Sequence, residues 1–140
     1  MSQKTFFITG ANSGFGFAIA AAASHQGHRV IGTVRSEQSR AAFEERLPTA
    51  RSVLCDVTEF DRIADVVRQV EEEHGPVDVL INNAGYGHEG ILEESSIEEM
   101  RRQFDVNVFG AVAVAKAFLP RFRERRRGFI VNVTSMGGMI

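Results

Sequence analysis

Short apolar runs alternate with longer amphipathic stretches along the 140 residues of the chain. The runs are rich in β-branched and aromatic residues, which is typical of buried strands. They cover residues 5–9, 29–34, 52–55, 77–81 and 129–133. The stretches between them predict helices over residues 14–26, 37–46, 59–73 and 97–118. This alternation predicts an α/β fold: a doubly wound parallel sheet covered by helices on both faces, as in the Rossmann fold.

The third and fourth predicted helices carry the clearest local signals. Residues 59–73 have apolar positions at three- and four-residue spacing, at Ile63, Val66, Val67 and Val70. Ser96 and Glu99 form the Ser-x-x-Glu pattern of a capping box, so a long helix is expected from residue 97 through Phe118. Its apolar positions are Phe104, Val108, Val112 and Phe118. They either cover the sheet or pair with a second subunit in a homo-oligomer.

A glycine-rich loop joins the first predicted strand to the first predicted helix. Gly10 suits a tight turn, Gly14 lets a phosphate group approach the backbone, and Gly16 permits close packing of the helix. The helix N-terminus offers unpaired N–H groups to an anion. The loop therefore predicts a dinucleotide diphosphate site, to which Asn12, Ser13 and Phe15 also belong. The alternative is a purely structural turn.

A second glycine-rich stretch, residues 85–90, matches the string G-x-G-x-x-G literally. It is not expected to bind phosphate, because polar residues 93–96 separate it from the next predicted helix. We interpret it as a flexible loop over the site.

Composition narrows the function classes. The formal net charge of −2 argues against nucleic acid as a partner. Cys55 is the only cysteine, and no signal peptide or run of ~18 apolar residues is evident, so a cytoplasmic protein without a membrane span is expected. The four histidines lack ligand spacing, and we expect no metal site. The arginines of residues 121–127 are interpreted as a solvated cluster at a helix end.

The spacing Gly10-x-x-x-Gly14-x-Gly16 resembles the short-chain dehydrogenase/reductase family. The resemblance extends over the whole chain, through Asp56-Val57, Asn82-Asn83-Ala84-Gly85, Asn107 and residues 130–135. It implies a Rossmann domain over residues 1–140 that stops after the fifth strand and is incomplete at its C-terminus. It also implies an oxidoreductase that interconverts a carbonyl compound and its alcohol by hydride transfer with a nicotinamide coenzyme.

The end of the second predicted strand indicates which coenzyme is bound. NAD sites usually carry an acid there, to bind the ribose 2′-hydroxyl, but in this chain Val34 occupies that position. Arg35 follows, and a guanidinium can bind a 2′-phosphate through two hydrogen bonds. Asn12 and Thr33 are candidates for further hydrogen bonds to that phosphate. NADP is therefore favoured over NAD, although Arg35 is alternatively a solvated residue before a helix.

The resemblance assigns the remaining cofactor contacts. It places Asp56 and Val57 at the adenine, with Asp56 accepting a hydrogen bond from the amino group. The alternative for Asp56 is an N-terminal cap of the next helix. The segment of Asn83, Ala84 and Gly85 matches the family's Asn-Ala-Gly, which flanks the adenine ribose and stabilises the sheet.

For the chemistry, the resemblance implies a tyrosine, a lysine, a serine and an asparagine. Ser135 matches the serine that holds the substrate oxygen, and Asn107 matches the asparagine that anchors a proton-relay water. Alternatively, Ser135 is a strand-end hydroxyl that satisfies local backbone, and Asn107 is a polar residue that caps packing inside a helix. The family's Tyr-x-x-x-Lys is missing, because the only tyrosine is Tyr86 and no lysine lies four residues after it. The chain alone is expected to be inactive, as part of a longer enzyme, or else to be a non-catalytic dinucleotide-binding module.

Overall fold

The computed structural model describes residues 2–139 and contains a five-stranded parallel sheet. The strands are β1 Thr5–Ile8, β2 Arg29–Val34, β3 Arg51–Leu54, β4 Val79–Asn82 and β5 Phe129–Asn132. Their order in the sheet is β3-β2-β1-β4-β5, and every neighbouring pair is parallel. The predicted α/β sheet is confirmed, with strand ends that differ by one or two residues from those expected.

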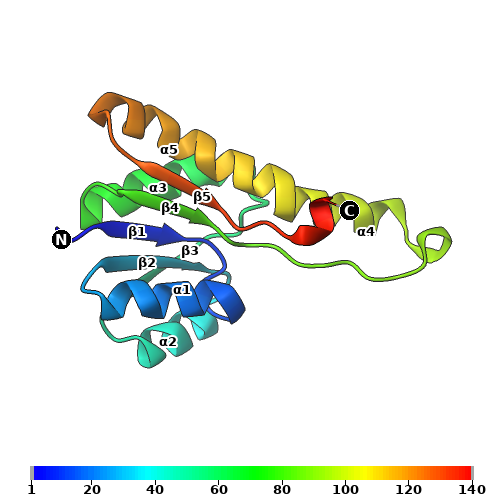
Figure 1. The fold of residues 1–140 in the computed structure, drawn as a ribbon, viewed down its shortest axis with the longest axis horizontal. Coiled ribbons are helices and arrows are strands. Elements are labelled where there is room, and N and C mark those ends of the chain that lie inside the picture. Colours follow the sequence, from blue (N-terminus) through cyan, green and yellow to red (C-terminus); the bar gives the residue numbers. More distant parts are fainter. Residues whose placement is uncertain (1, 140) are drawn as a thin grey trace.

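Helices cover both faces of the sheet (Figure 1). One layer holds α1 Gly14–His25 and α2 Glu37–Arg46, and the other holds α3 Phe60–His74 and α5 Ala111–Arg125. Two shorter elements, η1 Leu92–Glu94 and α4 Ile97–Phe104, precede α5. The predicted capping box of Ser96 and Glu99 at the start of α4 is confirmed. Among residues 2–139, no helix combines the length and apolar character that a membrane crossing needs.

Alternation of side chains along the central strands builds two cores. Phe7 and Leu80 belong to the cluster under α3 and α5, whereas Ile8 and Ile81 belong to the cluster under α1 and α2. Successive side chains of a strand point to opposite faces, so a strand covered on both sides must be apolar at consecutive positions. This explains why the strands appear in the sequence as continuous apolar runs.

The predicted continuous helix over residues 97–118 is wrong in two respects. A π-helical segment, Asp105–Gly110, separates α4 from α5, and α5 continues to Arg125 through Pro120. At Gly110 the helix packs so closely on Val57 that an added Cβ would lie 2.6 Å from a Val57 methyl group. The wider turn of a π-helix is a feature often found at functional sites.

The apolar positions of this region do not share one face. Phe118 is completely buried in the core beneath α5, whereas Phe104, Val108 and Val112 are about half exposed. Val112 and Phe118 both lie in α5, where six residues at about 3.6 per turn place them on different faces, and the π-helical turn further changes the spacing of Phe104 and Val108 relative to Phe118. The expectation that this face covers the sheet therefore holds for Phe118 and not for the other three residues.

The strand order reverses between β1 and β4, because β2 and β3 lie on one side of β1 and β5 lies beyond β4. In doubly wound sheets, ligands bind outside the carboxyl ends of the strands at such a switch point. The loops that leave β1 and β4 at this point are the glycine-rich loop and the Asn83-Ala84-Gly85 segment. The topology thus brings the two strongest sequence motifs to adjacent positions.

Candidate functional site

The glycine-rich loop after β1 needs its glycines for distinct reasons. Gly10 and Gly14 have φ angles of +63° and +55°, a region that favours glycine. An added Cβ on Gly14 would have no heavy atom within 4 Å, so the backbone here borders open space. A Cβ on Gly16 would collide with the carbonyl oxygen of Gly10 and lie 2.5 Å from Nδ2 of Asn83. The expected tight turn, open approach and close packing are all present.

The start of α1 is open to an incoming anion. Ser13 is the N-cap residue, but its side chain accepts no capping hydrogen bond. Asn12, Ser13 and Phe15 are exposed, with Phe15 exposing 76% of its surface. The N–H groups of the first helical turn are therefore available to an anion, and the exposed polar side chains of Asn12 and Ser13 lie beside them.

Thr33 of β2 holds the glycine-rich loop in place through two hydrogen bonds. Its hydroxyl accepts a hydrogen bond from the N–H of Gly10 at 3.1 Å, and its carbonyl accepts one from the N–H of Ala11 at 3.2 Å. Thr33 is 2% exposed. Its hydroxyl thus holds the loop, and the expectation that Thr33 hydrogen-bonds a 2′-phosphate does not agree with this burial.

A second set of hydrogen bonds ties the loop to the segment after β4. The hydroxyl of Thr9 accepts from the N–H groups of Asn83 at 3.0 Å and Ala84 at 2.9 Å. In return, Nδ2 of Asn83 donates to the carbonyl oxygens of Thr9 and Gly10, both at 3.1 Å. An added Cβ on Gly10 would lie 3.0 Å from Cα of Ala84, which leaves no room for a side chain. The two segments form one rigid unit.

Asn107 lies in the π-helical segment and fixes the next part of this loop. Its Oδ1 accepts from the N–H of Tyr86 at 3.0 Å, and its Nδ2 donates to the carbonyl of Tyr86 at 2.8 Å. A Cβ on Gly85 would lie 3.0 Å from the same Oδ1. Both polar atoms of the side chain are thus engaged with the backbone of the loop after β4.

Arg35 and Asp56 border a hollow of about 280 Å³ beyond the ends of β2 and β3. Arg35 is exposed, and its side chain makes no hydrogen bond within the described part of the chain. Oδ1 of Asp56 accepts from the N–H and hydroxyl of Thr58, at 2.9 and 2.7 Å. Burial alone would raise the pKa of Asp56, but these hydrogen bonds and the charge of Arg35 lower it.

The alternative that Asp56 caps the next helix is wrong. The N-cap position of α3 is Glu59, and it makes no side-chain capping bond. Asp56 instead forms a local turn with Thr58, two residues after it and before α3 begins at Phe60, and these two hydrogen bonds use only its Oδ1. Val57 is 6% exposed and packs against Gly110, so it can reach a ligand only through its backbone.

Ser135 follows β5 and is exposed, as expected for a residue at the mouth of the site. Its hydroxyl accepts a hydrogen bond from the N–H of Gly137 at 3.1 Å. The hydroxyl thus satisfies one local backbone group. A hydroxyl that accepts one hydrogen bond still has a proton to donate.

The sequence does not by itself predict that Asn82 is a buried residue that joins neighbouring elements. Asn82, which is 6% exposed, donates from Nδ2 to Oδ1 of Asn132 at 3.0 Å and to the carbonyl of Ala111 at 3.3 Å. These bonds join β4, β5 and the start of α5. The signal in the sequence is that an asparagine ends each of two apolar runs. Asn82 and Asn132 lie opposite each other because β4 and β5 pair in this register.

The family model described as short chain dehydrogenase matches residues 4–140. The chain belongs to the short-chain dehydrogenase family. The predicted resemblance is thus confirmed, and the switch-point loops described above are those of a short-chain dehydrogenase fold.

Curated relatives of this short-chain dehydrogenase chain are oxidoreductases. It is 42% identical to 3-ketodihydrosphingosine reductase of Bacteroides thetaiotaomicron over 140 residues. The aligned region covers all of the chain and 50% of the relative. It is 37% identical to retinol dehydrogenase 8 of Bos taurus, over 99% of the chain and 46% of the relative. The chain spans about half the length of the curated relatives it matches.

Solved structures agree on the fold. A short-chain dehydrogenase from Streptomyces avermitilis superposes with a TM-score of 0.92 at 42% identity, over 99% of the chain and 52% of that structure. An actinorhodin polyketide ketoreductase solved with NADPH superposes with a TM-score of 0.93 at 34% identity, over 99% of the chain and 55% of that structure.

Proposed function

We propose that the chain is a dinucleotide-binding domain for NADP(H). The observation that carries the coenzyme preference is Arg35, an exposed guanidinium without a hydrogen-bonding partner in the described residues, at the end of a strand that lacks an acid. A carboxylate at the end of β2 would repel a 2′-phosphate, whereas Arg35 offers it two N–H donors. The similar ketoreductase solved with NADPH supports this preference.

The remaining contacts follow from the geometry of the loops. The backbone around Gly14 and the first turn of α1 would receive the diphosphate, with Asn12, Ser13 and Phe15 beside it. Asp56 and the backbone of Val57 would border the adenine in the hollow next to Arg35. Asn83, Ala84 and Gly85 would border the ribose, since their backbone is fixed against Thr9 and Asn107.

We propose further that the full-length protein interconverts a small-molecule carbonyl compound and its alcohol. NADPH, when bound, supplies the hydride. Ser135 would hold the substrate oxygen, and Asn107 would keep the loop around Tyr86 in place beside it. Residues 1–140 hold no Tyr-x-x-x-Lys, so they would bind the coenzyme without turning over substrate. The second candidate function is a non-catalytic dinucleotide-binding protein.

Titration of the full-length gene product with NADPH and NADH tests the binding proposal. We expect saturable binding that is tighter for NADPH. The variant Arg35→Ala should weaken NADPH binding roughly 10- to 100-fold, the value of one or two charge-assisted hydrogen bonds, and leave NADH nearly unchanged. The control variant Arg123→Ala removes an exposed arginine of α5 and should change neither affinity. Equal losses for both coenzymes in the Arg35 variant would contradict the NADP assignment.

A reduction assay separates the two candidate functions. Turnover of carbonyl compounds by the full-length protein, abolished by Ser135→Ala, would support the enzyme. Saturable coenzyme binding without turnover of any of a broad set of ketones and aldehydes would support the binding module. We also propose a cytoplasmic location, which microscopy of a tagged full-length protein would test.

The exposed apolar residues of α4, the π-helical segment and the start of α5 support a proposed homo-oligomer. Phe104, Val108 and Val112 each expose 42% to 56% of their surface, and their burial against a second copy would remove this area from water. Sedimentation of the full-length protein tests this. We expect an oligomer that Val108→Glu dissociates, whereas a monomeric wild-type protein would contradict the proposal.

A further inference from the structure

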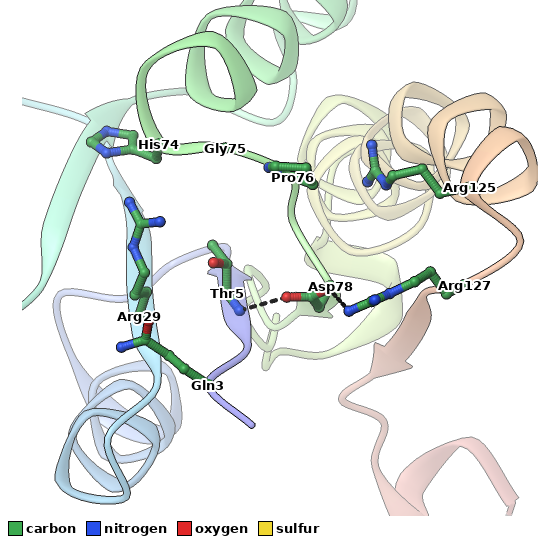
Figure 2. Close-up of a pocket in the computed structure, with 9 residues that line it drawn as sticks. All are labelled: Gln3, Thr5, Arg29, His74, Gly75, Pro76, Asp78, Arg125 and Arg127. Atoms are coloured by element: carbon green, nitrogen blue, oxygen red, sulfur yellow. Dashed lines mark hydrogen bonds and ion pairs between the residues drawn. The ribbon is translucent and has the colours of Figure 1, made fainter. Parts of the chain in front are cut away.

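A second hollow lies at the end of the sheet opposite to the candidate cofactor site. It has a volume of about 320 Å³ and is lined by Gln3, Thr5, Arg29, His74, Gly75, Pro76, Asp78, Arg125 and Arg127 (Figure 2). Thr5 and Arg29 begin β1 and β2, and Asp78 precedes β4. The hollow is therefore formed at the amino ends of parallel strands, away from the ends where the glycine-rich loop lies.

The charge of this hollow differs from that of the chain. Three arginines and one aspartate line it, so the lining has a formal charge of +2 with His74 neutral, on a chain with a net charge of −2. The arginines come from three places, the start of β2, the end of α5 and the link to β5. Such convergence of one sign of charge in a concave site attracts small ligands of the opposite sign.

Some of these groups are already paired. Arg125 donates to both oxygens of Glu71, at 3.1 and 2.9 Å, and to the carbonyl of Val77 at 3.0 Å. Arg127 donates from one terminal nitrogen to Asp78 at 2.8 Å, while the other oxygen of Asp78 accepts from the N–H of Thr5 at 2.9 Å. The aspartate is thus neutralised by its own partners, and Arg127 keeps further N–H donors. These pairings also correct the expectation of a fully solvated arginine cluster.

Two donors in the hollow have no such partner. The guanidinium of Arg29 makes no hydrogen bond or ion pair with residues 2–139, and it lies against Gly75 at the end of α3. The hydroxyl of Thr5 likewise makes no hydrogen bond with the described residues, although Thr5 is only 5% exposed. Both groups border the hollow, so a guanidinium and a hydroxyl without a partner among the described residues are available to a ligand there.

We infer that this hollow binds a phosphate-type oxyanion, either free phosphate or the phosphoryl group of a small metabolite. The available donors lie on different sides of the cavity, the unpaired Arg29 on one wall and the remaining N–H groups of Arg127 on another, with Thr5 between them. A tetrahedral anion presents acceptors in all of these directions, whereas a planar carboxylate is best matched by a single guanidinium fork. The ligand bridges β1, β2 and the link before β5, which makes this a site separate from the coenzyme.

The inference is tested by titrating the full-length protein with inorganic phosphate at constant ionic strength. Amide chemical shifts monitor the binding. Saturating NADPH is present, so that the glycine-rich loop is not available to phosphate. We expect saturable shifts at Thr5, Arg29, Gly75 and Asp78, and none of similar size at Gly14. If NADPH itself fails to bind, the shifts at the two ends of the sheet still report the two sites separately.

Charge-neutral variants identify the donors. Arg29→Gln and Arg127→Gln change exposed residues and should each weaken phosphate binding by at least about tenfold, while Arg123→Gln on the surface of α5 should leave it unchanged. Absence of saturable shifts, or equal affinity in all three variants, would overturn the site. Acetate binding as tightly as phosphate would overturn the assignment to a tetrahedral anion.

Discussion

The hydroxyl of Thr9 accepts a hydrogen bond from the N–H of Ala84 at 2.9 Å, across 75 positions of sequence. The same oxygen accepts from the N–H of Asn83, so a side chain at the end of β1 holds the backbone that leaves β4. Thr9 is 1% exposed. Because this oxygen lies in a buried side chain, the two hydrogen bonds that it accepts contribute strongly to the orientation of the two loops, together with those that Asn83 donates.

Thr9→Val should therefore destabilise the protein by about 1–3 kcal/mol, since it leaves two buried N–H groups without an acceptor and keeps the volume of the side chain. Coenzyme affinity should fall as well, because the two loops lose their fixed spacing. Urea unfolding and NADPH titration measure the two effects. Thr9→Ser keeps the hydroxyl and serves as the control. Unchanged stability of the valine variant would contradict the role given to this oxygen.

Gly16→Ala should be far more harmful than a change of glycine in an open position. A Cβ at residue 16 would collide with the carbonyl of Gly10 and lie 2.5 Å from Nδ2 of Asn83. We expect a loss of about 1–3 kcal/mol in unfolding free energy together with loss of NADPH binding. Gly87→Ala is the matched control, since an added Cβ there has no heavy atom within 4 Å. Similar unfolding midpoints for the two variants would show that the loop can widen.

Asn107→Ala should release the backbone of Tyr86, because both the N–H and the carbonyl of Tyr86 lose a partner. Since Asn107 is exposed and water can replace it, the expected cost in stability is only about 1 kcal/mol. Hydrogen exchange of the Tyr86 amide should accelerate markedly. Gln103→Ala removes only the longer contact of 3.4 Å to the same carbonyl and should leave the exchange rate nearly unchanged. Equal exchange rates in both variants would argue against the Asn107 clamp.

We expect the free energy of unfolding to fall in acid, because Glu71 becomes protonated. Its side chain is 7% exposed and accepts hydrogen bonds from Arg125, Arg121 and the N–H of Val77. Burial alone would raise the pKa of Glu71, but these partners outweigh it and lower the pKa. The ionised carboxylate therefore stabilises the fold above the unfolded pKa of about 4.3, and this contribution is lost as pH falls through the lower folded pKa.

Glu71→Gln should cost about 2–3 kcal/mol at pH 7, because it leaves two arginines without a counter-charge in a partly buried place. The difference between wild type and variant should shrink below pH 4. Thermal unfolding from pH 3 to pH 7 measures this. Glu72→Gln, on an exposed ion pair with Arg68, is the control and should change stability by less than about 1 kcal/mol. A difference that stays constant with pH would contradict this account.

Cys55 should react slowly with alkylating reagents in the folded protein. Burial, together with the negative charges of Asp56 and Glu59, raises the pKa of its thiol to about 11. At pH 8 the thiolate, which is the reactive form, is then ~100-fold rarer than in the unfolded chain. Labelling followed by mass spectrometry with and without urea measures the ratio. Equal labelling rates would contradict the burial of this thiol.

Much of the fold follows from short-range pattern. The central strands β1, β2 and β4 are runs that must be apolar on both faces, and the amphipathic period of α3 is visible in Ile63, Val67 and Val70. The glycine-rich loop is recognisable in the sequence because its turn needs backbone conformations that glycine adopts readily. Gly10 and Gly14 do have positive φ angles. These features are local, so the linear order of residues contains them.

Other features of the site are not local. That Thr33 supports Gly10, that Asn83 holds the loop carbonyls and that Asn107 clamps Tyr86 all depend on which strands become neighbours. The π-helical turn that holds Asn107 ends at Gly110, which packs closely against Val57 from another part of the chain. No periodicity within the helix records that contact, and for this reason the helix was expected to be regular.

The sequence by itself determined the strands, the order of layers, the glycine turn and the position of Arg35, since each depends on a residue's own conformational preference or on its near neighbours. Only the tertiary structure decided how polar side chains are paired, which arginines are neutralised by Glu71 and Asp78, and which donors of Thr5 and Arg29 stay free. Hydrogen bonds and ion pairs between distant residues form only after the sheet has brought them together, and their partners are therefore set by topology.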